Sequence, residues 1–485
     1  MKILSVDVGT SGVRAGIYDE ELKCLSTHSV RTKLYRKNGG IVETDPDEIF
    51  NNFVKVSSLT INEVKEKVGI SDLTLLSFSL QGEAFVCVDK NNVPKCFSPV
   101  SMDERGKEFA EKLSFNFSSD EYRDITGQPL HPMFSAFKIA SDARFHNMVE
   151  GEFFLPLDAY ISVKLGASAY ADITSAARFG LLNVDKTQWD ERLCKIFGVD
   201  LSNLPPLVMP GQFVGEVSDD WKVKLGVSSA LKIMAGAHDQ ACAFWGSGGN
   251  TKGVATYSLG TTDCFTQGSV TRKVLPKNSG LATYKCFENL WVTLAGTAAS
   301  GWSLEWLDKI LNNDIGVSVK QMVKDFSDNP TDLLVLPYLA GSGTIDNDPN
   351  MRGVILGVSL ETDRRDIVRA FLEASGYEVA KIVASTANVF ESIRDIHAVG
   401  GGVADKKVMQ LRANACNFPL KCLGYDAALR GAAIQALVGE GIFADYSKAP
   451  AFESVSSVTP CAEYVEHYEK QRKKYVCAYN ALKSL

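Results

Sequence analysis

A short segment near the start of the chain recurs in outline about halfway along it. Val6-Asp7-Val8-Gly9-Thr10-Ser11 corresponds to Tyr257-Ser258-Leu259-Gly260-Thr261-Thr262, and each copy lies between two runs rich in β-forming residues. A glycine followed by hydroxyl residues between two such runs is typical of a tight turn that joins two strands. The repeat therefore predicts an α/β protein built from two similar halves, each starting with a strand–turn–strand unit and facing a shared cleft.

The length of the chain and the position of the repeat also define the expected domains. A chain of 485 residues is too long for one ordinary core, so two domains are the natural expectation. The small-residue stretch 246–250 precedes the second copy, which predicts one domain over residues 1–248 and another over residues 249–485. Sequence patterns predict strands over 2–7, 13–18, 29–34, 73–79, 253–259 and 263–267, and helices beginning near Pro46, near Asp363 and after Gly402.

Composition excludes several kinds of partner. The net charge is −7, and the longest basic run is the short Arg472-Lys473-Lys474, so nucleic acid and anionic membranes are poor candidates. The sequence has nothing near the roughly eighteen consecutive apolar residues of a membrane-spanning helix, and Asp7 interrupts its apolar start. The eleven cysteines are scattered singly, which is typical of reduced thiols, so we expect a cytoplasmic protein.

The first copy of the repeat could bind phosphate. In Asp7-Val8-Gly9-Thr10-Ser11 the backbone N–H groups of the turn could cradle phosphate oxygens, and Arg14 could add positive charge. Asp7, at the end of a buried strand, could hold Mg²⁺ through water, because magnesium prefers carboxylates together with retained waters. For this copy alone, a plain hairpin in which Asp7 accepts hydrogen bonds from the turn is the simpler explanation.

The second copy favours the phosphate site. Gly260-Thr261-Thr262 supplies another donor turn, but Ser258 stands in the place of the acid. A purely structural repeat gives no reason to keep the carboxylate in one half only. The two copies together therefore predict a split phosphate site with a carboxylate for the metal at Asp7.

Asp239 is the candidate catalytic base. It lies in Ala235-Gly236-Ala237-His238-Asp239-Gln240-Ala241, where small neighbours let a substrate hydroxyl approach the carboxylate. Phosphoryl transfer needs little beyond such a base, in-line positioning and neutralised charge. The alternative is a helix N-cap, since Asp239 also begins an alanine-rich helical stretch. We expect His238 to pack or to donate a hydrogen bond rather than to catalyse.

Two further groups of residues suit ligands. Gly400-Gly401-Gly402 follows a strand-like run, and backbone without side chains can lie against an adenine or approach a phosphate, although a tight strand–helix turn explains the triplet too. Gln81, Glu83 and Asp103 follow strand-like segments in the first domain. They could bond substrate hydroxyls, although each one alone could be a solvated loop residue.

Taken in order, these motifs resemble the FGGY carbohydrate kinases, which belong to the actin–hexokinase–chaperone ATPase superfamily. The resemblance runs from end to end, and it is shared among xylulokinases, gluconate kinases and glycerol kinases. Its anchors are Asp7 to Ser11, Gln81, Asp103 with Arg105, Thr126-Gly127, Asp239, Gly260 to Thr262, Gly301 with Trp306, Arg352-Gly353, Gly400 to Gly402 and Gly431-Ala432-Ala433.

The resemblance implies two ribonuclease-H-like domains of the actin-like ATPase fold that flank a central cleft, with ATP mainly on the second domain and substrate mainly on the first. It implies Asp239 as the general base, with Asp7 and Asp239 placing Mg²⁺. The protein could form a homodimer. The implied cofactor-binding positions are Gly9, Thr10, Ser11, Arg14, Gly260, Thr261, Thr262, Gly301, Gly400, Gly401 and Asp405, the last standing where relatives tend to have Ser or Asn.

Departures from the family pattern indicate the acceptor. Glycerol kinases have an Arg before the Glu and an aromatic wall, whereas this chain has Gly82 before Glu83 and Ser101 in the place of an aromatic residue. Both changes remove volume, so we predict a sugar larger than glycerol, a ketopentose such as xylulose. Gluconate, glycerol or another polyol is the alternative acceptor, and an actin-like ATP-binding switch without kinase activity is the alternative class. The substrate-binding residues that we expect are Gln81, Gly82, Glu83, Asp103 and Asp239.

Overall fold

The chain folds into two compact α/β units in the computed structural model, which describes residues 1–260, 262–297, 300–311, 318–326, 329–424, 426–451 and 454–483. The first unit contains Met1–Gly246, Thr283–Val292 and Ala427–Ala451, and the second contains Ser247–Ala282, Thr293–Asp426 and Phe452–Leu485. The expectation of two α/β domains is confirmed. The expected split at residue 248 is too simple, because helix α14 (Ala427–Gly439) packs on strands β1 and β6 of the first unit.

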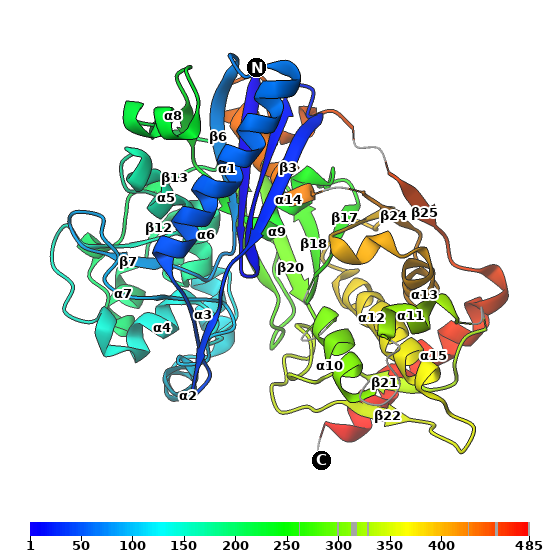
Figure 1. The fold of residues 1–485 in the computed structure, drawn as a ribbon. Helices are drawn as coiled ribbons and strands as arrows, with labels where there is room; N and C mark the ends of the chain where they lie inside the picture. Colours follow the sequence, from blue (N-terminus) through cyan, green and yellow to red (C-terminus); the bar gives the residue numbers. More distant parts are fainter. Residues whose placement is uncertain are drawn as a thin grey trace. The chain divides into compact units, whose positions relative to one another are not determined.

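A mixed sheet forms the centre of the first unit (Figure 1). Its strand order is β14-β15-β6-β1-β2-β3, and β16 pairs with β6 as well. Strand β1 runs antiparallel to β2 and parallel to β6, and only Thr10 and Ser11 separate β1 from β2. The strands span Lys2–Gly9 (β1), Gly12–Asp19 (β2), Cys24–Arg31 (β3), Leu73–Leu80 (β6), Phe213–Glu216 (β14), Lys232–Met234 (β15) and Ala237–His238 (β16).

Strand β3 begins and ends earlier than the predicted range 29–34. It spans Cys24–Arg31 because it pairs along almost the whole of β2, from Arg31 opposite Gly12 to Cys24 opposite Tyr18. The register of the hairpin decides this position, and the alternation of side chains does not encode it. The other predicted strands begin and end within two residues of their observed positions.

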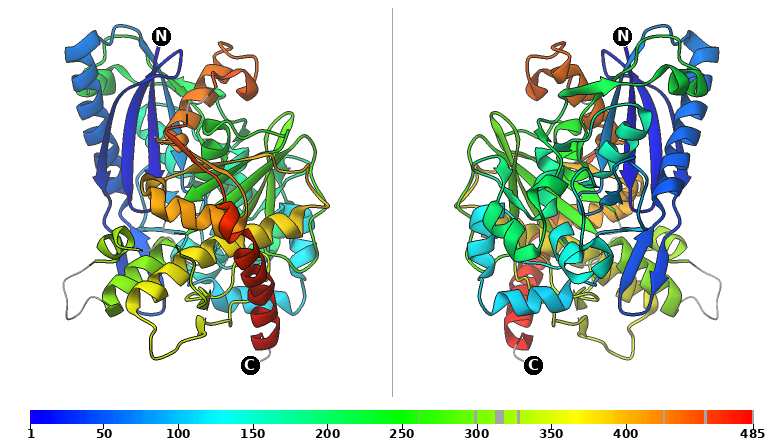
Figure 2. Two further views of the ribbon diagram at one scale, coloured as in Figure 1. Left: turned by 90° about the vertical axis from the view of Figure 1, so that its right-hand side faces the viewer. Right: turned by 90° about the vertical axis from the view of Figure 1, so that its left-hand side faces the viewer.

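Helices cover both faces of this sheet. Helix α1 (Pro46–Val68) begins at Pro46 as predicted, Asp45 caps its first turn, and it packs on β2 and β3. Both figures of the fold show it along one side of these strands (Figures 1 and 2). Ala15 and Ile17 of β2 share a hydrophobic core with the apolar side of α1. The residue between them, Gly16, faces the other way and lies against Leu429 of α14.

Helix α9 (Asp239–Gly246) packs against α14 at backbone distance. A Cβ atom on Gly431 would lie 2.0 Å from the Cys242 carbonyl oxygen, and one on Gly246 would lie 1.9 Å from the Ala427 carbonyl oxygen. Neither position therefore has room for a side chain. Because α9 begins at Asp239, this contact holds the helix that carries the candidate base.

The remaining elements of the first unit connect the strands of this sheet, and α5 (Leu157–Leu165) among them packs on β6. They are β4 (Tyr35–Lys37), β5 (Ile41–Thr44), β7 (Val86–Val88), β8 (Ser98–Pro99), α2 (Lys107–Ser114), α3 (Ser119–Thr126), α4 (Ser135–Ser141), β9 (Phe153–Leu155), α5 (Leu157–Leu165), β10 (Ala171–Asp172), α6 (Ile173–Phe179), β11 (Leu182–Asn183), β12 (Gln188–Trp189), α7 (Glu191–Phe197), β13 (Leu207–Val208) and α8 (Asp219–Leu225).

The sheet of the second unit repeats the pairing of the first. Strand β17 runs antiparallel to β18 and parallel to β23, as β1 does with β2 and β6. The order is β19-β20-β18-β17-β23-β24-β25, which confirms the internal repeat seen in the sequence. The strands span Val254–Leu259 (β17), Asp263–Ser269 (β18), Ala282–Phe287 (β19), Leu290–Gly296 (β20), Asp395–Val399 (β23), Leu420–Cys422 (β24) and Ser456–Val458 (β25).

Helix α12 (Arg364–Thr386) is the longest helix described in the second unit. It begins near Asp363 as predicted, and Asp363 caps it. It packs against α13 (Lys406–Cys416) and α15 (Val465–Leu482), and all three contribute to one hydrophobic core. The unit also contains α10 (Gly301–Leu311), α11 (Val319–Lys324), β21 (Leu334–Leu336) and β22 (Val354–Leu356). Within the described part of the chain, none of the helices has the length and apolarity needed to cross a membrane.

Replacing Gly431 by Ala tests the contact between α9 and α14. In an ordinary helix interior, Gly→Ala stabilises by up to about 1 kcal/mol. Here the new methyl group meets the Cys242 carbonyl oxygen, so we expect the free energy of unfolding to fall by about 1–3 kcal/mol. Thermal unfolding monitored by circular dichroism measures the change. A melting temperature equal to or above that of the wild type would contradict the close packing.

Candidate active site

The register of three parallel strands gathers the candidate residues of the first unit. Asp7 of β1 lies beside Ser79 of β6, and Ser79 lies beside Ala237 of β16. Gln81 follows the end of β6, and Asp239 follows the end of β16. Ligands of open α/β sheets characteristically bind at the carboxyl ends of the strands. The sheet therefore brings candidate residues from three distant segments to one edge.

Asp7 is held by two neighbours on adjacent strands. Its Oδ2 accepts hydrogen bonds from Arg14, with the guanidinium Nη2 2.7 Å away, and its Oδ1 accepts one from the Ser79 hydroxyl at 2.7 Å. The Arg14 side chain is 50% exposed, whereas that of Asp7 is 4% exposed. Because both carboxylate oxygens already accept a bond, the geometry suits a role on the water shell of Mg²⁺ better than direct ligation.

The two predicted phosphate turns, at Thr10-Ser11 and at Gly260-Thr262, are not described equally completely. In the first unit, the Thr10 hydroxyl donates to the Gln81 side chain at 2.8 Å, and Ser11 is exposed at the tip of the hairpin. This bond ties the predicted phosphate turn to a predicted substrate residue. In the second unit, Gly260 and Thr262 are exposed at the corresponding turn, and Thr261 lies outside the described residues. Binding of phosphate by these residues stays a prediction.

The environment of Asp239 favours the protonated form of its carboxyl. Burial raises the pKa of Asp239 to about 7, and the charges of Asp7 and Glu83 add to the rise. His238 Nε2 lies 3.3 Å from Oδ1 of Asp239. Burial and the charge of Arg178 lower the pKa of His238 to about 3, so the imidazole is neutral and forms no ion pair with Asp239. A base with a pKa near neutrality is matched to proton abstraction at physiological pH.

Tyr284 completes a short chain of polar groups behind the base. Its hydroxyl lies 2.6 Å from Nδ1 of His238. Either the Tyr284 hydroxyl or Nδ1 can be the donor, because the role of the ring nitrogen depends on the tautomer of the neutral imidazole. The expectation that His238 packs or donates a hydrogen bond rather than catalysing stays a prediction. Tyr284 was missed by sequence reasoning, because no motif marks a tyrosine that lies 46 residues from its partner.

Glu83 forms a buried ion pair with Arg178 of α6. The Nε of Arg178 donates to Oε1 of Glu83 at 2.7 Å, and Nη1 donates to the Gln128 side-chain oxygen at 2.6 Å. Burial acts to raise the pKa of Glu83, but the charge of Arg178 outweighs it and lowers that pKa. The Gln128 side-chain amide nitrogen is buried without a hydrogen-bond partner among the described residues. This leaves a donor available beside the pair.

Gly82 does not leave the space that the sequence suggests. A Cβ atom there would lie 2.5 Å from Cγ of Arg178 and 2.7 Å from Cδ2 of His238. The prediction that Gly82 removes volume is therefore wrong, because the side chain of Arg178, from helix α6, fills this space. Gly82 is required so that Arg178 and His238 can approach the backbone beside Glu83.

Asp103 is occupied by a neighbouring arginine. Its Oδ2 accepts from the Val42 N–H at 2.7 Å and from Arg105 at 2.7 Å, and its Oδ1 accepts from Nε of Arg105 at 2.8 Å. Arg105 also donates to Glu43, which is fully buried. The geometry gives Asp103 the task of orienting Arg105. A direct contact with substrate stays a prediction that these bonds do not favour.

Lys138 of α4 ties two loops of this region together. Its ammonium donates to the Glu83 carbonyl oxygen at 2.9 Å and to the Val100 carbonyl oxygen at 2.7 Å. Burial lowers the pKa of Lys138 to about 7. Nothing in the sequence pattern indicates this role, because a lysine in a short helix is ordinarily a surface residue.

The glycine triplet of the second unit divides into two packing residues and one open position. A Cβ atom on Gly400, whose φ is 97°, would lie 2.4 Å from the Leu259 carbonyl oxygen, and one on Gly402 would lie 3.0 Å from the Leu259 Cβ. A Cβ atom on Gly401 would meet nothing within 4 Å. The triplet thus braces the strand that leads into the Gly260 turn, and Gly401 is the member with room for a ligand.

The last two nucleoside candidates begin helices. Gly301 is the first residue of α10, and the Asp405 side chain caps α13 by accepting from the Lys407 N–H at 3.0 Å and the Val408 N–H at 3.2 Å. Capping accounts for an acid at position 405. Contacts of Gly301 and Asp405 with a nucleoside stay predictions.

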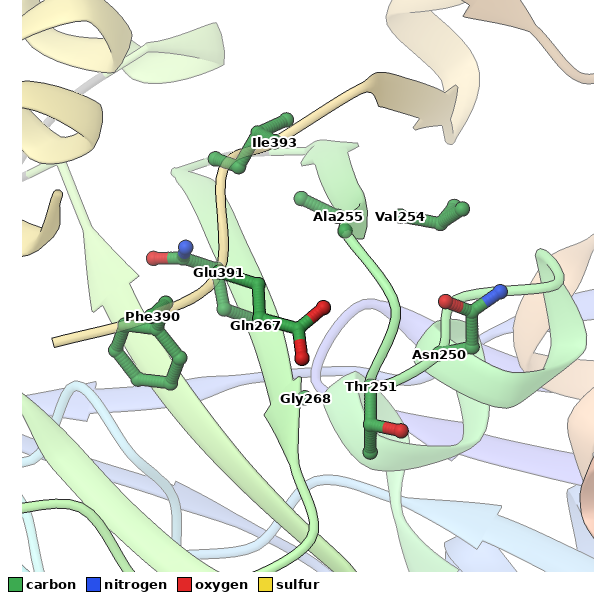
Figure 3. A pocket seen from close by; sticks show the side chains of 10 residues that line it. Asn250, Thr251, Val254, Ala255, Gln267, Gly268, Phe390, Glu391 and Ile393 are labelled. Atoms are coloured by element: carbon green, nitrogen blue, oxygen red, sulfur yellow. The ribbon is translucent and has the colours of Figure 1, made fainter.

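A small cavity in the second unit lies away from these residues. Figure 3 shows Asn250, Thr251, Gln267 and Glu391 around it, at the start of β17 and the end of β18. The Gly260 turn joins the opposite ends of the same two strands. The cavity holds about 10 Å³, room for about one water, so it can take neither a sugar nor a nucleotide.

The comparisons identify the family to which this arrangement belongs. Residues 2–246 match the N-terminal domain of the FGGY family of carbohydrate kinases, and residues 255–440 match its C-terminal domain. The chain belongs to this family, and it is an ATP-dependent sugar kinase with the two-domain actin-like ATPase fold. The resemblance of the sequence motifs to this family is confirmed.

Similar proteins are named as kinases of different acceptors. A xylulose kinase of Staphylococcus epidermidis is 27% identical over 100% of this chain and 97% of its own length. A glycerol kinase of Coxiella burnetii is 26% identical over 91% of this chain and 89% of its own length. The structure of a xyloylose kinase from Brucella ovis superposes with a TM-score of 0.90 at 22% identity, covering 100% of both chains. The fold is thus common to relatives with different substrates.

The raised pKa of Asp239 predicts how activity depends on pH. Asp239 accepts a proton only when ionised, and its pKa is raised from 3.8 to about 7, so kcat/KM for the acceptor should rise with pH through about 7. Initial rates at saturating ATP, between about pH 5.5 and 8.5, measure this profile. Glu83→Gln removes one repelling charge and should move the rise to lower pH. A profile that is level across the range would contradict the assignment.

Gly400 and Gly401 form a matched pair for a second test. We expect Gly400→Ala to lower the free energy of unfolding by about 1–3 kcal/mol, because the methyl group meets Leu259 at a positive φ. Gly401→Ala should stay within about 0.5 kcal/mol of the wild type, and it should raise the KM for ATP if a ligand lies there. Thermal unfolding of both variants measures the first effect. Equal destabilisation by the two substitutions would contradict the described packing.

Proposed function

We propose that this chain transfers the γ-phosphate of ATP to a hydroxyl of a ketopentose such as xylulose, with Asp239 as the general base. The observation that carries the proposal is the raised pKa of Asp239, which lies at the carboxyl edge of the sheet. Burial, together with the charges of Asp7 and Glu83, raises this pKa to about 7. The base takes the proton of the acceptor hydroxyl as that oxygen attacks the phosphorus, and ADP leaves.

The neighbouring residues of the first unit would bind and orient the acceptor. Glu83 can accept a hydrogen bond from a sugar hydroxyl, Gln128 has an unpartnered amide nitrogen to donate, and Gln81 lies next to the Thr10 turn. A site whose buried polar groups are left unpaired by a poor substrate loses roughly 1–3 kcal/mol for each such group. This supports an acceptor with several hydroxyls over one with few.

Mg²⁺ would lie on the side of Asp7. When bound, the ion neutralises charge that develops on the transferred phosphoryl group. Asp7, fixed by Arg14 and Ser79, would hold waters of the ion, and Asp239 would lie near enough to feel the same charge. The hydroxyl turns at Thr10-Ser11 and Gly260-Thr262 would donate to phosphate oxygens.

The choice of a ketopentose rests on the named relatives and on the polar side chains of Gln81, Glu83 and Gln128, and not on the volume of the site. The Staphylococcus epidermidis relative is a xylulose kinase, and a glycerol kinase of Coxiella burnetii is almost equally similar. Because Arg178 fills the space beside Gly82, the argument that the site is wider than that of a glycerol kinase no longer holds at this position. Gluconate, glycerol and other polyols are therefore the alternatives to test.

A panel of acceptors with matched variants tests the proposal. ADP release is measured with xylulose, ribulose, fructose, gluconate and glycerol, for the wild type, Asp239→Asn and Asp200→Asn. We expect the highest kcat/KM with a pentulose, and a loss of about 10²-fold or more in kcat for Asp239→Asn with ATP affinity nearly unchanged. Asp200→Asn is the control, because Asp200 is an exposed helix cap and Asn caps equally well.

Two outcomes would contradict separate parts of the proposal. Near-normal turnover of Asp239→Asn at saturating acceptor would contradict its role as base. A higher kcat/KM for glycerol or gluconate than for every pentulose would contradict the acceptor. ADP release that no acceptor stimulates would instead favour an ATP-binding switch.

A further inference from the structure

Two fully buried carboxylates lie behind the strand that carries the candidate base. Asp158 lies in the first turn of α5, and Asp172 caps α6; both are 0% exposed. Neither belongs to the residues that would touch acceptor, nucleotide or metal. Each carboxylate has one oxygen that is well bonded and one that is buried without a hydrogen-bond partner among the described residues, Oδ1 of Asp158 and Oδ2 of Asp172.

The bonded oxygen of Asp158 holds the backbone three residues before the base. Its Oδ2 accepts from the Gly236 N–H at 3.0 Å and from the Tyr170 hydroxyl at 2.8 Å. A Cβ atom on Gly236 would lie 2.6 Å from this oxygen, so the glycine lets the carboxylate reach the main chain.

The bonded oxygen of Asp172 acts on the same strand through a threonine. Its Oδ1 accepts from the Thr174 N–H at 2.9 Å, from the Ser175 N–H at 3.1 Å and from the Thr174 hydroxyl. The Thr174 hydroxyl oxygen in turn accepts from the His238 N–H at 2.8 Å. The two carboxylates therefore support Gly236 and His238, on either side of Ala237, directly before Asp239.

The electrostatic surroundings disfavour two charges here. Burial and the charge of Asp172 together raise the pKa of Asp158 to about 7, and burial also raises the pKa of Asp172. The other titratable groups that interact with the pair are the Tyr170 hydroxyl and the thiols of Cys242 and Cys286. Burial raises the pKa of all three, so they are neutral and cannot balance a second negative charge.

A single proton on the pair would reduce the cost of burying two negative charges. If both carboxylates were ionised in this buried position, each would pay a desolvation cost that no neighbouring positive charge among the described residues offsets. Oδ1 of Asp158 and Oδ2 of Asp172 would also have no hydrogen-bond donor among the described residues. A proton on one carboxyl removes the repulsion between the two charges and lowers the cost of burying the pair. Bound metal is a poorer explanation, because the described part of the chain shows no group of three or more His, Cys, Asp or Glu side chains placed to hold an ion.

We infer that Asp158 and Asp172 carry one proton between them at neutral pH, and that this pair fixes Gly236 and His238 so that Asp239 points in its working direction. The pair consists of positioning residues, and its effect on catalysis rests on the proposed role of Asp239. The presence of one proton on the pair does not rest on that role, so the two parts have separate tests.

The single proton on the pair is tested with Asp158→Asn and Asp172→Asn. In Asp158→Asn, the new side-chain amide can donate as the protonated carboxyl does and still accept from Gly236 and Tyr170, so the folded state at neutral pH should be retained. Because the folded pKa of Asp158 is raised from 3.8 to about 7, its contribution to stability is full below about pH 4 and is lost as pH rises to about 7. The melting temperature of Asp158→Asn should therefore fall less than that of the wild type between these pH values.

Infrared spectroscopy reads the proton directly. At neutral pH, Asp158→Asn should reduce the carbonyl band of protonated carboxylic acids relative to the wild type. Asp172→Asn should move the ionisation of Asp158 to lower pH, since it removes the repelling charge. An unchanged band in Asp158→Asn, or an Asp158 ionisation that Asp172→Asn does not move, would overturn the single proton on the pair whatever the activity of the variants.

The positioning is tested with Thr174→Val and Thr174→Ser. Valine leaves the His238 N–H without its acceptor, and we expect kcat to fall about 10-fold or more with the KM for ATP unchanged, because small misplacements of a reacting group are costly. Serine keeps the hydroxyl and should restore most of kcat. Wild-type kcat in a folded Thr174→Val would overturn the positioning. If Asp239→Asn were also fully active, the result would contradict the role of Asp239 as base and would not test the positioning by Asp158 and Asp172.

Discussion

The carboxylate of Asp239 lies near two other carboxylates, those of Asp7 and Glu83, whose negative charges repel it. Asp7 and Glu83 each have an arginine of their own, Arg14 and Arg178, and they act on Asp239 as fixed negative charges. The nearest partner of Asp239 is the imidazole of His238, which the same surroundings hold neutral. Burial, together with the charges of Asp7 and Glu83, leaves the base with a high proton affinity, which is the property that the rest of the site depends on.

The fold supplies this arrangement through rigid elements. Strands β1, β6 and β16 set Asp7, Ser79 and Ala237 side by side. Helix α9, which begins at Asp239, is held by its close backbone contact with α14. Behind the strand, Asp158 and Thr174 hold the N–H groups of Gly236 and His238. Each support acts on main chain or on a buried side chain, so little of the geometry depends on exposed loops.

The sequence predicted local structure well and long-range contacts poorly. The two glycine turns and the helices that begin near Pro46 and Asp363 follow from residues adjacent in the chain. Arg178 lies 95 residues from Glu83, and only the packing of α6 against the loop after β6 brings them together, so the volume beside Gly82 was misread. The position of β3 depends on the register of a hairpin, and the neutrality of His238 depends on burial, which no motif encodes.

A crystal structure of the protein with a pentulose and a non-hydrolysable ATP analogue tests the central claim most directly. If Asp239 takes the proton of the acceptor, one hydroxyl oxygen of the sugar will lie about 2.6–3.2 Å from its carboxylate and will point toward the terminal phosphate. If the hydroxyl nearest to the terminal phosphate bonds instead to Glu83 or to water, with Asp239 out of reach, the account of the base is contradicted.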